Sequence, residues 1–525
     1  MGSEEEILET SGIGLKKFFA AVVFTIQALA SAELFLKAFS LGMIPDKYLY
    51  GLGIILWLLL MISALLLFVG LNRRATAACV IRRIFAVLLA IVICAVSVLS
   101  YKVLDRAKTA VKEVSVEQTD TEEAAAAMMN LYVIDTDPAK TVADCRSYLV
   151  GTAAGDNVRN SKAALNKMSS ETGTAIKTKE YDSEDELIEA LYIGEVNAAL
   201  INSAQAEILS ETEEYGDYFA KTKLIKEYSI TDSDLAFIPA EPGTTTQTEK
   251  KSGTKDDSSV EGSITNTPFI VYLSGSDTRS KKFKTSRSDV NILMAVNPKT
   301  KQILLVNTPR DYYIPNPKSS KGERDKLTHV GLYGVGCSMQ GLGDLYGCKV
   351  NYSVQINFTG LETLVDQLGG ITIDNPQAFS RSGYKFKKGK ITLNGKEALV
   401  YARERHAFTS GDNMRGQNQM RIITAMIRKA TSSKSQILKN YSGIMSALSG
   451  MFKTSMPASD IEKLVKMQLN DMAEWKITSY AVTGKDSSAT TYSSPKYKAY
   501  VMLPDDMSVA VGADKIKRVL AGKEL

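Results

Sequence analysis

Histidine is almost absent from this chain: its 525 residues contain only His329 and His406. Zinc centres with histidine ligands and Ser-His-Asp triads both need histidine beside the reacting group, so this scarcity argues against both kinds of site. Strong positive charge is missing too, because the formal net charge is only +5. No lysine-rich block carries interleaved aromatic residues, so nucleic acid is not expected as a partner.

Long uncharged runs are scarce in most of the chain but abundant in its first hundred residues. Three apolar segments there approach the twenty residues that a bilayer-spanning helix needs, at about 18–36, 49–71 and 84–100. The first segment contains Gln27 and Glu33, and a cleaved signal peptide is the alternative interpretation of it. Because the start of the chain is acidic and two apolar segments follow, we expect an uncleaved helix. Residues 1–101 are therefore predicted to form a membrane anchor with three transmembrane helices.

Basic residues indicate the orientation of this anchor. Four arginines lie between the second and third apolar segments, at Arg73, Arg74, Arg82 and Arg83. The loop at Pro45 to Lys47, before the second segment, has one lysine. Loops rich in Lys and Arg stay in the cytoplasm. We therefore expect a cytoplasmic amino terminus and an extracellular location for everything after Tyr101.

Composition divides the rest of the chain into four parts. Residues 102–130 are rich in Ala, Glu, Lys and Val without turn signals, which predicts a juxtamembrane helix. Strand-like and helix-like runs alternate in residues 131–240 and indicate a small α/β accessory domain. Residues 241–266 have too few apolar groups to fold and read as a flexible linker, which leaves 267–525 as an outer domain. In the accessory domain, the small-residue loop at 151–157 could bind an anion or be only a turn.

Charged residues flank three short apolar runs of the outer domain. The runs have the length and β-branched content of buried strands and lie at 269–273, 290–296 and 302–306. Their flanking residues of opposite charge are Asp277 and Arg279, Arg287 and Asp289, and Arg310 and Asp311. Carboxylates can hold a divalent metal, and guanidinium groups match phosphate oxygens. We predict a phosphate site at one rim of a sheet; the alternative is a solvated surface on which the arginines pair with the aspartates.

Two later segments contribute further arginines. The segment 398–405 alternates in polarity, which predicts a strand that points Arg403 and Arg405 to the same side. Two such arginines repel each other unless an anion lies between them. If a helix opens at 412, Arg415 and Gln419 share a face at the i, i+4 spacing. This pattern is typical of an anion site or, without the neighbouring arginines, of an exposed polar stripe.

Residues 359–370 read as a helix that ends at Gly369. Its apolar residues gather on one face and comprise Leu361, Leu364, Val365 and Leu368. This face could pack in an ordinary core, or it could form, with the preceding Phe358, the wall of a cavity for a lipid chain. The sequence leaves both interpretations open.

Cys337 and Cys348 would meet an oxidising space outside the cell and could form a disulfide. The residues between them read as a helix, whose ends stand farther apart than the roughly 4.4 to 6.8 Å that separates the Cα atoms of a disulfide. The pairing therefore remains open.

The ordered motifs of the outer domain resemble those of the LytR-CpsA-Psr family of cell-wall polymer ligases. The motifs are GlySerAsp at 275–277, ArgSerAsp at 287–289, ProArgAsp at 309–311, LysLeuThrHis at 326–329, LeuValAspGlnLeuGlyGly at 364–370, LeuAsnGly at 393–395, TyrAlaArgGluArg at 401–405 and AspAsnMetArg at 412–415. The resemblance covers residue 267 to at least 430. It implies an α/β (α+β) domain with a central mixed β-sheet flanked by helices, behind a membrane anchor.

The resemblance implies a transferase that moves a glycopolymer from a polyprenyl pyrophosphate carrier to peptidoglycan through a phosphodiester bond. The polymer would be teichoic acid, capsule or another secondary wall polysaccharide, and cell-wall or capsule assembly proteins would be further partners. Two alternatives stay open. In a polyprenyl pyrophosphate phosphatase, water would replace the sugar hydroxyl. In a non-catalytic sensor, the outer domain would only hold lipid.

The resemblance also implies roles for individual residues. The pyrophosphate would be bound by Arg287, Arg310, Arg403, Arg405, Arg415 and Gln419, with Arg310, Arg405 and Arg415 counted as catalytic. Asp277 and Asp289 would hold Mg²⁺, or Mn²⁺ in its place, and Asp289 would activate the incoming hydroxyl. Asp311 and Asp412 would support these groups, although Asp412 could simply cap a helix.

One departure from the family pattern concerns the last motif. Many members continue it with Arg-Gln-Gln, whereas this chain has Asn418, Gln419 and Met420. One expected positive charge is therefore missing. Either Arg421 or Arg287 could compensate for it, or the carrier is bound slightly differently.

Overall fold

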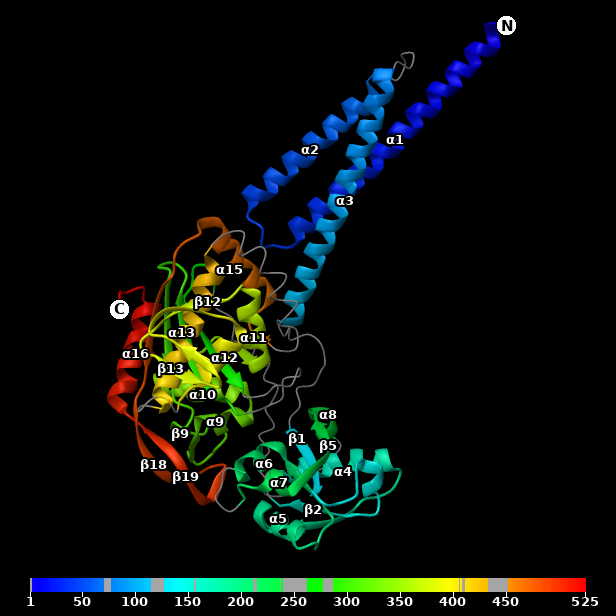
Figure 1. The fold of residues 1–525 in the computed structure, drawn as a ribbon. Helices are drawn as coiled ribbons and strands as arrows, with labels where there is room; N and C mark the ends of the chain where they lie inside the picture. Colours follow the sequence, from blue (N-terminus) through cyan, green and yellow to red (C-terminus); the bar gives the residue numbers. More distant parts are fainter. Residues whose placement is uncertain are drawn as a thin grey trace.

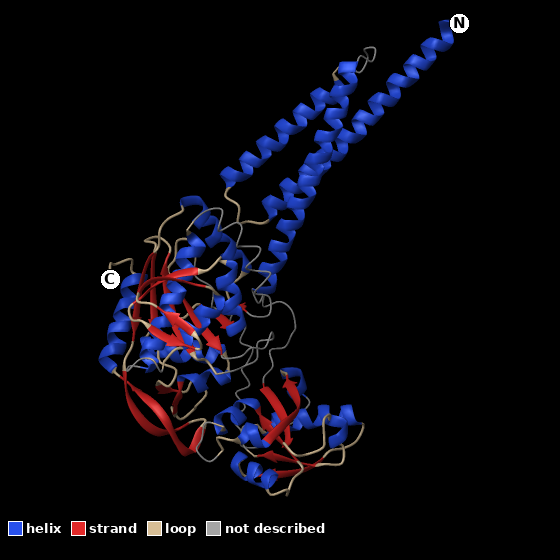
Figure 2. Cartoon of the chain, in the orientation of Figure 1, coloured by secondary structure: helices blue, strands red, loops and turns tan. Residues whose placement is uncertain are grey.

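The computed structural model describes residues 2–69, 77–114, 127–154, 157–210, 215–236, 238, 262–276, 287–405, 407, 411–432 and 452–525. Figure 1 shows three long helices at one end of the chain, a larger domain beside them and a smaller α/β unit beyond it. Helices and strands alternate in both folded units (Figure 2).

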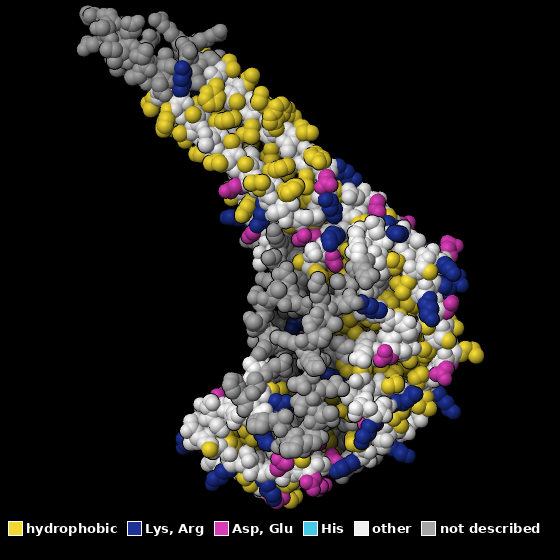
Figure 3. Space-filling model, turned by 180° about the vertical axis from the view of Figure 1, so that it is seen from behind, with side chains coloured by type: hydrophobic (Ala, Val, Ile, Leu, Met, Phe, Trp, Pro, Cys, Tyr) yellow, Lys and Arg dark blue, Asp and Glu magenta, His cyan; other side chains and the backbone are white. Residues whose placement is uncertain are grey.

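The three amino-terminal helices are α1 (Gly2–Ser40), α2 (Asp46–Phe68) and α3 (Ala77–Val114). Each contains a segment long and apolar enough to cross a membrane: Leu15–Ser40, Asp46–Phe68 and Cys79–Asp105. Large apolar side chains are exposed along these helices, and Figure 3 shows how densely they cover the surface. Exposed apolar surface of this extent suits a lipid environment and confirms a membrane anchor.

The smaller unit is built on a sheet of five strands in the order β3-β2-β4-β1-β5. The strands are β1 (Ala127–Ile134), β2 (Leu149–Ala153), β3 (Lys177–Tyr181), β4 (Ala198–Asn202) and β5 (Thr222–Ile230). β1 runs antiparallel to β4 and β5, whereas β2 runs parallel to β3 and β4. The sheet is therefore mixed, as an α/β unit of this size allows.

Short helices cover both faces of this five-stranded sheet. They are η1 (Val142–Cys145), α4 (Val158–Thr172), α5 (Glu184–Tyr192), α6 (Ser203–Leu209), α7 (Tyr218–Lys221) and α8 (Asp232–Ala236). Neighbouring residues of β1 point to opposite faces, so Leu131 joins one core with Met168, and Tyr132 joins the other with Leu187.

The predicted helix over 102–130 is correct only in part. Helix α3 runs to Val114, residues 115–126 lie outside the described part of the chain, and the last four residues of the predicted helix begin strand β1. Ala127 and Met128 pair with Ile230 and Ser229 of β5. Pairing with a distant strand thus overrides the local helix preference of this alanine-rich segment.

The larger domain is built on six strands in the order β16-β11-β6-β7-β8-β17. The strands are β6 (Phe269–Ser276), β7 (Val290–Asn297), β8 (Gln302–Asn307), β11 (Tyr352–Asn357), β16 (Phe452–Thr454) and β17 (Lys476–Ala481). β6, β7 and β8 are successive antiparallel neighbours, whereas β11 and β17 join the sheet in parallel. This confirms the predicted central mixed sheet.

Helices pack on both faces of the six-stranded sheet. One face carries α9 (Leu327–Val330), η2 (Gly331–Tyr333), α10 (Val335–Tyr346) and α16 (Asp506–Leu520). The other face carries α13 (Gly411–Thr431) and α15 (Ala458–Asp471), with α11 (Phe358–Gln367) and α12 (Gly395–Arg403) beside them. Both layers are apolar toward the sheet, which explains why the strands read as continuous apolar runs.

Four pairs of short strands complete the larger domain. They are β9 (Tyr313–Pro315) with β10 (Arg324–Lys326), β12 (Ile371–Asn375) with β15 (Gly389–Leu393), β13 (Phe379–Arg381) with β14 (Tyr384–Phe386), and β18 (Gly484–Thr491) with β19 (Ser494–Pro504).

The predicted strand at 398–405 is wrong, because Gly395–Arg403 forms helix α12. Asn394 accepts a hydrogen bond from the backbone N–H of Glu397, and the Glu397 carboxylate accepts one from the Asn394 backbone N–H. This reciprocal capping box is a strong helix start signal and decides the local structure. Arg403 therefore ends a helix and Arg405 follows it, so the two do not share one face of a strand.

No disulfide joins Cys337 and Cys348, because both thiols are free. Cys337 lies in the first turn of α10, whereas Cys348 follows the end of the helix, and its backbone N–H donates to the Gly343 carbonyl at 3.0 Å. Six residues of helix rise separate Cys337 from Gly343, which is about 9 Å and longer than the Cα separation of a disulfide. Burial raises the pKa of each thiol to about 11.

Candidate functional site

Arg310 is the centre of the charged rim, just beyond the end of β8. Its Nη1 donates a hydrogen bond to Asp289 Oδ1 at 2.5 Å, and its Nε lies 3.5 Å from Asp311 Oδ2. β7 and β8 are antiparallel, so the start of one strand meets the end of the other. The sheet thereby places Asp289 beside Arg310 although 21 residues separate them.

A pocket of about 560 Å³ opens beside this ion pair. Predicted site residues from four segments of the chain line it, namely Asp289, Arg310, Arg403, Arg405, Arg415 and Gln419. Phe358 lines it too. The structure therefore brings together most of the groups that the sequence could only associate by motif.

The ends of α12 and α13 position the arginines. The Arg403 guanidinium lies over the Phe358 ring, 4.3 Å from its centroid, which is a cation–π contact. Gln419 is buried and donates from Nε2 to the Ala402 carbonyl at 3.5 Å. Asn418, one residue earlier, donates to the Tyr401 carbonyl at 3.3 Å. These contacts fix α13 against the end of α12, and Arg415 lies one helical turn before Gln419.

Gly416 allows α13 to approach the end of β8. A Cβ atom at this position would lie 2.2 Å from Asn307 Nδ2, so a larger residue would require the Asn307 side chain or the helix to move. Arg415, the residue before this glycine, lines the pocket.

Positive charge dominates the pocket lining. Six basic side chains face three acidic ones: Arg310, Arg381, Lys396, Arg403, Arg405 and Arg415 against Asp289, Glu362 and Glu404. Glu404 is buried and its carboxylate pairs with Arg381 at 3.1 Å, which offsets part of the charge. The excess of cationic groups favours a multiply charged anion.

Several further residues lie in or near the pocket although they are not among the predicted site residues. Arg381 and Lys396 line it, from β13 and from the first turn of α12. Lys326 is buried and its Nζ lies 3.7 Å from Asp311 Oδ1, which extends the charge network behind Arg310. Only Lys326 gave a signal, as the first residue of the LysLeuThrHis motif. The motif's His329 is also buried, 3.1 Å from Asp325, and belongs to the core rather than to the pocket.

Other predicted residues are not brought to the pocket. Arg287 does not line it; its Nε lies 3.3 Å from Glu207 Oε2 on α6 of the smaller unit. Asp277, Arg279 and His406 lie outside the described residues, as does the side chain of Asp412. Among the residues that the structure describes, no cluster of three metal-ligating side chains is present.

A second cavity, of about 480 Å³, lies between the sheet and helices α11, α13 and α15. Apolar side chains line nearly all of it, including Phe269 and Met294 from the sheet and Leu464 from α15. Of the five residues predicted as a lipid-cavity wall, Leu364 and Leu368 line this cavity. Phe358 instead faces the charged pocket, and Leu361 and Val365 pack into the core beneath α11.

One domain thus combines a cationic pocket with an apolar cavity. This pairing defines a class of site suited to an amphiphilic anion, because the charged and apolar parts of such a ligand need different surroundings.

Residues 239–507 match the family described as LytR_cpsA_psr. The chain belongs to this family. A relative in Enterococcus faecalis, polyisoprenyl-teichoic acid–peptidoglycan teichoic acid transferase TagU, is 37% identical over 199 residues. The match covers 38% of this chain and 64% of that relative. TagU of Bacillus subtilis is 38% identical over 169 residues, which cover 32% of this chain and 54% of the relative.

Solved structures of similar proteins cover half of this chain. The crystal structure of B. subtilis TagU is 28% identical, covers 50% of this chain and 100% of its own, and has a TM-score of 0.38. The structure of TagT bound to LIIa-WTA is 25% identical, covers 50% of this chain and 94% of its own, and has a TM-score of 0.40.

Proposed function

We propose that this protein transfers a glycopolymer from a polyprenyl pyrophosphate carrier to peptidoglycan and forms a phosphodiester bond. The observation that carries the proposal is the convergence of Arg310, Arg403, Arg405 and Arg415 on one pocket, in a domain that also holds an apolar cavity. Arginine stays charged at any working pH and matches phosphate oxygens with its planar fork. The name of the TagU relatives supports teichoic acid as one candidate polymer.

The reaction is a displacement at phosphorus. A sugar hydroxyl oxygen of peptidoglycan bonds to the phosphorus that carries the polymer, while the bond from this phosphorus to the bridging oxygen breaks. The bridging oxygen leaves with the polyprenyl phosphate, and the hydroxyl proton passes to a base or to solvent. Most of the help in such a step comes from alignment and from neutralising the departing charge, which the arginines would supply.

Asp289 has two proposed roles. Its carboxylate lines the pocket and holds Arg310, so it positions a phosphate-binding group. We also assign it the activation of the sugar hydroxyl, which requires that hydroxyl to lie within hydrogen-bond reach.

The donor chemistry at Asp289 fits a magnesium ion, because carboxylate oxygens are the ligands that Mg²⁺ prefers. Asp277 would be the second ligand, and Mn²⁺ could replace Mg²⁺. When bound, the metal would neutralise charge on the diphosphate.

The apolar cavity would take the start of the polyprenyl chain. It is lined by Met294 and Val354 on the sheet, Ile427 on α13 and Leu464 on α15, a set without charge. Burying hydrocarbon in such a cavity is favourable because it removes apolar surface from water. The membrane anchor and the basic connection between α2 and α3 support an orientation in which the outer domain meets peptidoglycan outside the cell.

The test uses the full chain in liposomes with a radiolabelled, lipid-linked polymer, magnesium and peptidoglycan. Label that becomes attached to the glycan supports the transferase. Label released only as free polymer phosphate would indicate the phosphatase instead. If the protein binds the carrier without releasing either product, the outer domain is a lipid-binding sensor and the proposal is wrong.

A further inference from the structure

The segment between the first two membrane helices packs against the outer domain. We define residues 41–47 as the anchor loop. Leu41 and Met43 of this loop are buried and form an apolar cluster with Leu104 of α3 and with Ile461 and Val465 of α15. An otherwise short extracellular connection is thus part of a hydrophobic core.

Polar contacts hold the anchor loop along the length of α15. Lys466 Nζ lies 2.9 Å from Asp46 Oδ1, and Lys47 Nζ donates to the Asn470 carbonyl at 3.0 Å. Nearer the start of α15, a Cβ atom on Gly42 would lie 2.7 Å from Glu462 Oε2. Contacts spread over two turns of the helix fix the direction of α15 relative to the anchor, which one contact could not do.

The same helix is a wall of the apolar cavity. Ile461 and Val465 touch the anchor loop cluster and also line the cavity. Phe452 and Thr454 of β16 line it as well, and α3 lies beside β16. One side of the cavity is therefore bounded by the two elements on which the membrane anchor rests, as the position of α15 next to the long helices in Figure 1 indicates.

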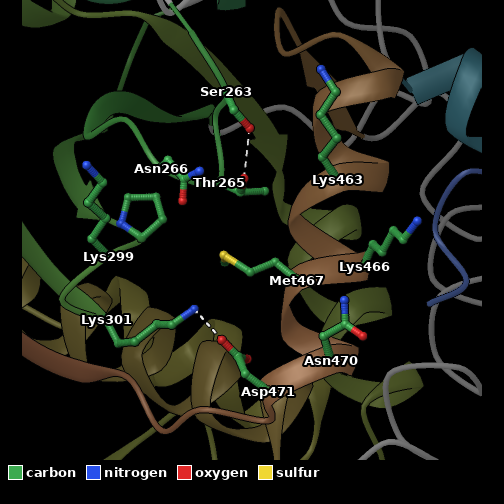
Figure 4. Close-up of a pocket in the computed structure, with 11 residues that line it drawn as sticks. Ser263, Thr265, Asn266, Lys299, Lys301, Lys463, Lys466, Met467, Asn470 and Asp471 are labelled. Atoms are coloured by element: carbon green, nitrogen blue, oxygen red, sulfur yellow. Dashed lines mark hydrogen bonds and ion pairs between the residues drawn. The ribbon is translucent and has the colours of Figure 1, made fainter. Parts of the chain in front are cut away.

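A pocket lined by lysines lies on a neighbouring face of α15, and Met467 lines both this pocket and the apolar cavity. Its volume is about 650 Å³, and its basic residues are Lys299, Lys301, Lys463 and Lys466. Figure 4 shows Lys463 and Lys466 projecting from α15, and Lys301 paired with Asp471 at the far end of the helix. Three of these lysines pair with aspartates: Lys463 with Asp460, Lys466 with Asp46 and Lys301 with Asp471. The contacts with the anchor loop bring α15 to the end of the membrane-spanning segments.

We infer that the anchor loop and α15 form the entrance through which the carrier lipid passes from the bilayer into the apolar cavity. The inference rests on the proposed function of the cavity. A hydrocarbon chain that crossed open water on its way would expose apolar surface, which is unfavourable. With the anchor docked, Leu41, Met43, Ile461 and Val465 provide apolar contacts from the membrane side up to the cavity wall. The membrane anchor is thus part of the lipid-binding machinery rather than a tether alone.

The experiment compares two substrates in liposomes that contain the full chain. One is a lipid-linked polymer with a long prenyl chain, which sits in the bilayer; the other is a water-soluble analogue with a short prenyl chain. Met43→Glu places a charge in the apolar cluster and should lower the ratio of long-chain to short-chain transfer rates about tenfold, since small misplacements of a bound substrate are costly. Met507→Glu, at an exposed methionine of α16, is the matched control and should leave the ratio unchanged.

A second set of variants guards against misfolding of the anchor. Asp46→Lys and Lys466→Asp each create like charges where an ion pair stands, and each should lower the long-chain to short-chain ratio. The double variant restores opposite charges and should recover the ratio. If the ratio of long-chain to short-chain transfer rates is unchanged in Met43→Glu and in both single variants, the inferred lipid entrance is wrong. Failure of the unaltered protein to transfer either substrate would instead overturn the proposed function.

Discussion

The two sheets of this protein have similar architectures and different strand ends. Both are mixed sheets with apolar side chains on both faces and helices over each. In the smaller unit, β4 ends at Asn202, whose side chain accepts from the Ala204 backbone N–H and donates to Asn157. In the larger domain, β8 is followed by Arg310, which lines a pocket, and by Asp311, whose Oδ2 lies 3.5 Å from Arg310 Nε. In the smaller unit, the polar side chains at this strand end form hydrogen bonds with one another and with the nearby backbone, so the unit has a structural role there. In the larger domain, the sheet brings charged side chains together beside a pocket, where they can bind a ligand.

The two units also differ in how completely their helices fill the space over the sheet. In the smaller unit, Ala164 and Met168 of α4 are fully buried against β1 and β4. In the larger domain, α13 and α15 leave a cavity over β6 and β7. Because protein interiors are normally close-packed, an apolar cavity of this volume supports the proposed lipid site.

Arg310→Ala should lower the transfer rate more than any other substitution considered, because it removes the arginine at the centre of the charged rim. We expect transfer to fall by about a hundredfold, the usual cost of losing one preorganised group that stabilises developing charge. The measurement is the transfer rate in liposomes, with the melting temperature recorded alongside.

Arg146→Ala is the matched control for this variant, since Arg146 is an exposed arginine of the smaller unit. It should transfer at the unaltered rate. If Arg310→Ala and Arg146→Ala are both folded and equally active, the charged rim of the larger domain is not the active site.

Ala430→Phe tests the difference in packing. Ala430 lines the apolar cavity, so a larger side chain has room there and should raise the KM for the long-chain carrier with little loss of stability. The matched change in the smaller unit is Ala164→Phe, in a filled core. Overpacking there should cost about 1 to 3 kcal/mol or more of unfolding free energy.

Chemical denaturation of both variants, followed by fluorescence and circular dichroism, separates these outcomes. Equal destabilisation by the two substitutions would mean that the cavity in the larger domain has no room for a ligand.

The sequence predicted the strands around Arg310 better than it predicted the arrangement of the arginines. Apolar runs bounded by charge located β6, β7 and β8 because buried strands have little other composition available to them. The alternation of the run before Arg405 predicts a strand, but the capping box of Asn394 and Glu397 starts a helix there instead. Local periodicity is weak evidence when a helix start signal precedes it.

Contacts between segments that are distant in the chain could not be predicted from the sequence. Arg381 pairs with the buried Glu404 only because β13 packs near the end of α12, and no motif marks this arginine. The contact between Arg287 and Glu207 likewise depends on how two units meet. The contact between the anchor loop and α15 could not be predicted either. The sequence shows only a short connection between two membrane helices, and nothing in it indicates that its apolar residues are buried against α15.

Glu207→Gln alters a contact that joins the two regions. Glu207 is paired with Arg287, which the family motif assigns to the pyrophosphate but which does not line the pocket. Neutralising the glutamate should release Arg287 toward the carrier and lower its KM, by less than about fivefold because partly exposed ion pairs contribute little. Glu171→Gln, which removes an ion pair with Lys226 inside the smaller unit, is the control. A KM that rises in Glu207→Gln, or falls equally in both variants, contradicts this role.

Asp505→Ala should have the smallest effect, and only on stability. It tests whether an aspartate carboxylate stabilises a helix start to the same extent in both units. Asp505 caps α16, and hydrogen bonds from the backbone N–H of Ser508 and the Thr483 hydroxyl hold the pKa of its carboxyl below the ordinary value. In the smaller unit, the backbone N–H of Lys140 and the hydroxyl of Thr141 lower the pKa of Asp144 in the same manner.

A carboxyl with a depressed folded-state pKa stabilises the fold above the unfolded-state pKa, and this contribution is lost as the pH falls through the folded-state pKa. Asp505→Ala and Asp144→Ala should therefore each lower the melting temperature of their own unit near neutral pH. Both deficits should shrink as the pH falls below the ordinary aspartate pKa of about 3.9 and vanish below the folded-state pKa. A deficit that persists unchanged in acid would show that the lost contribution is packing rather than the charged cap.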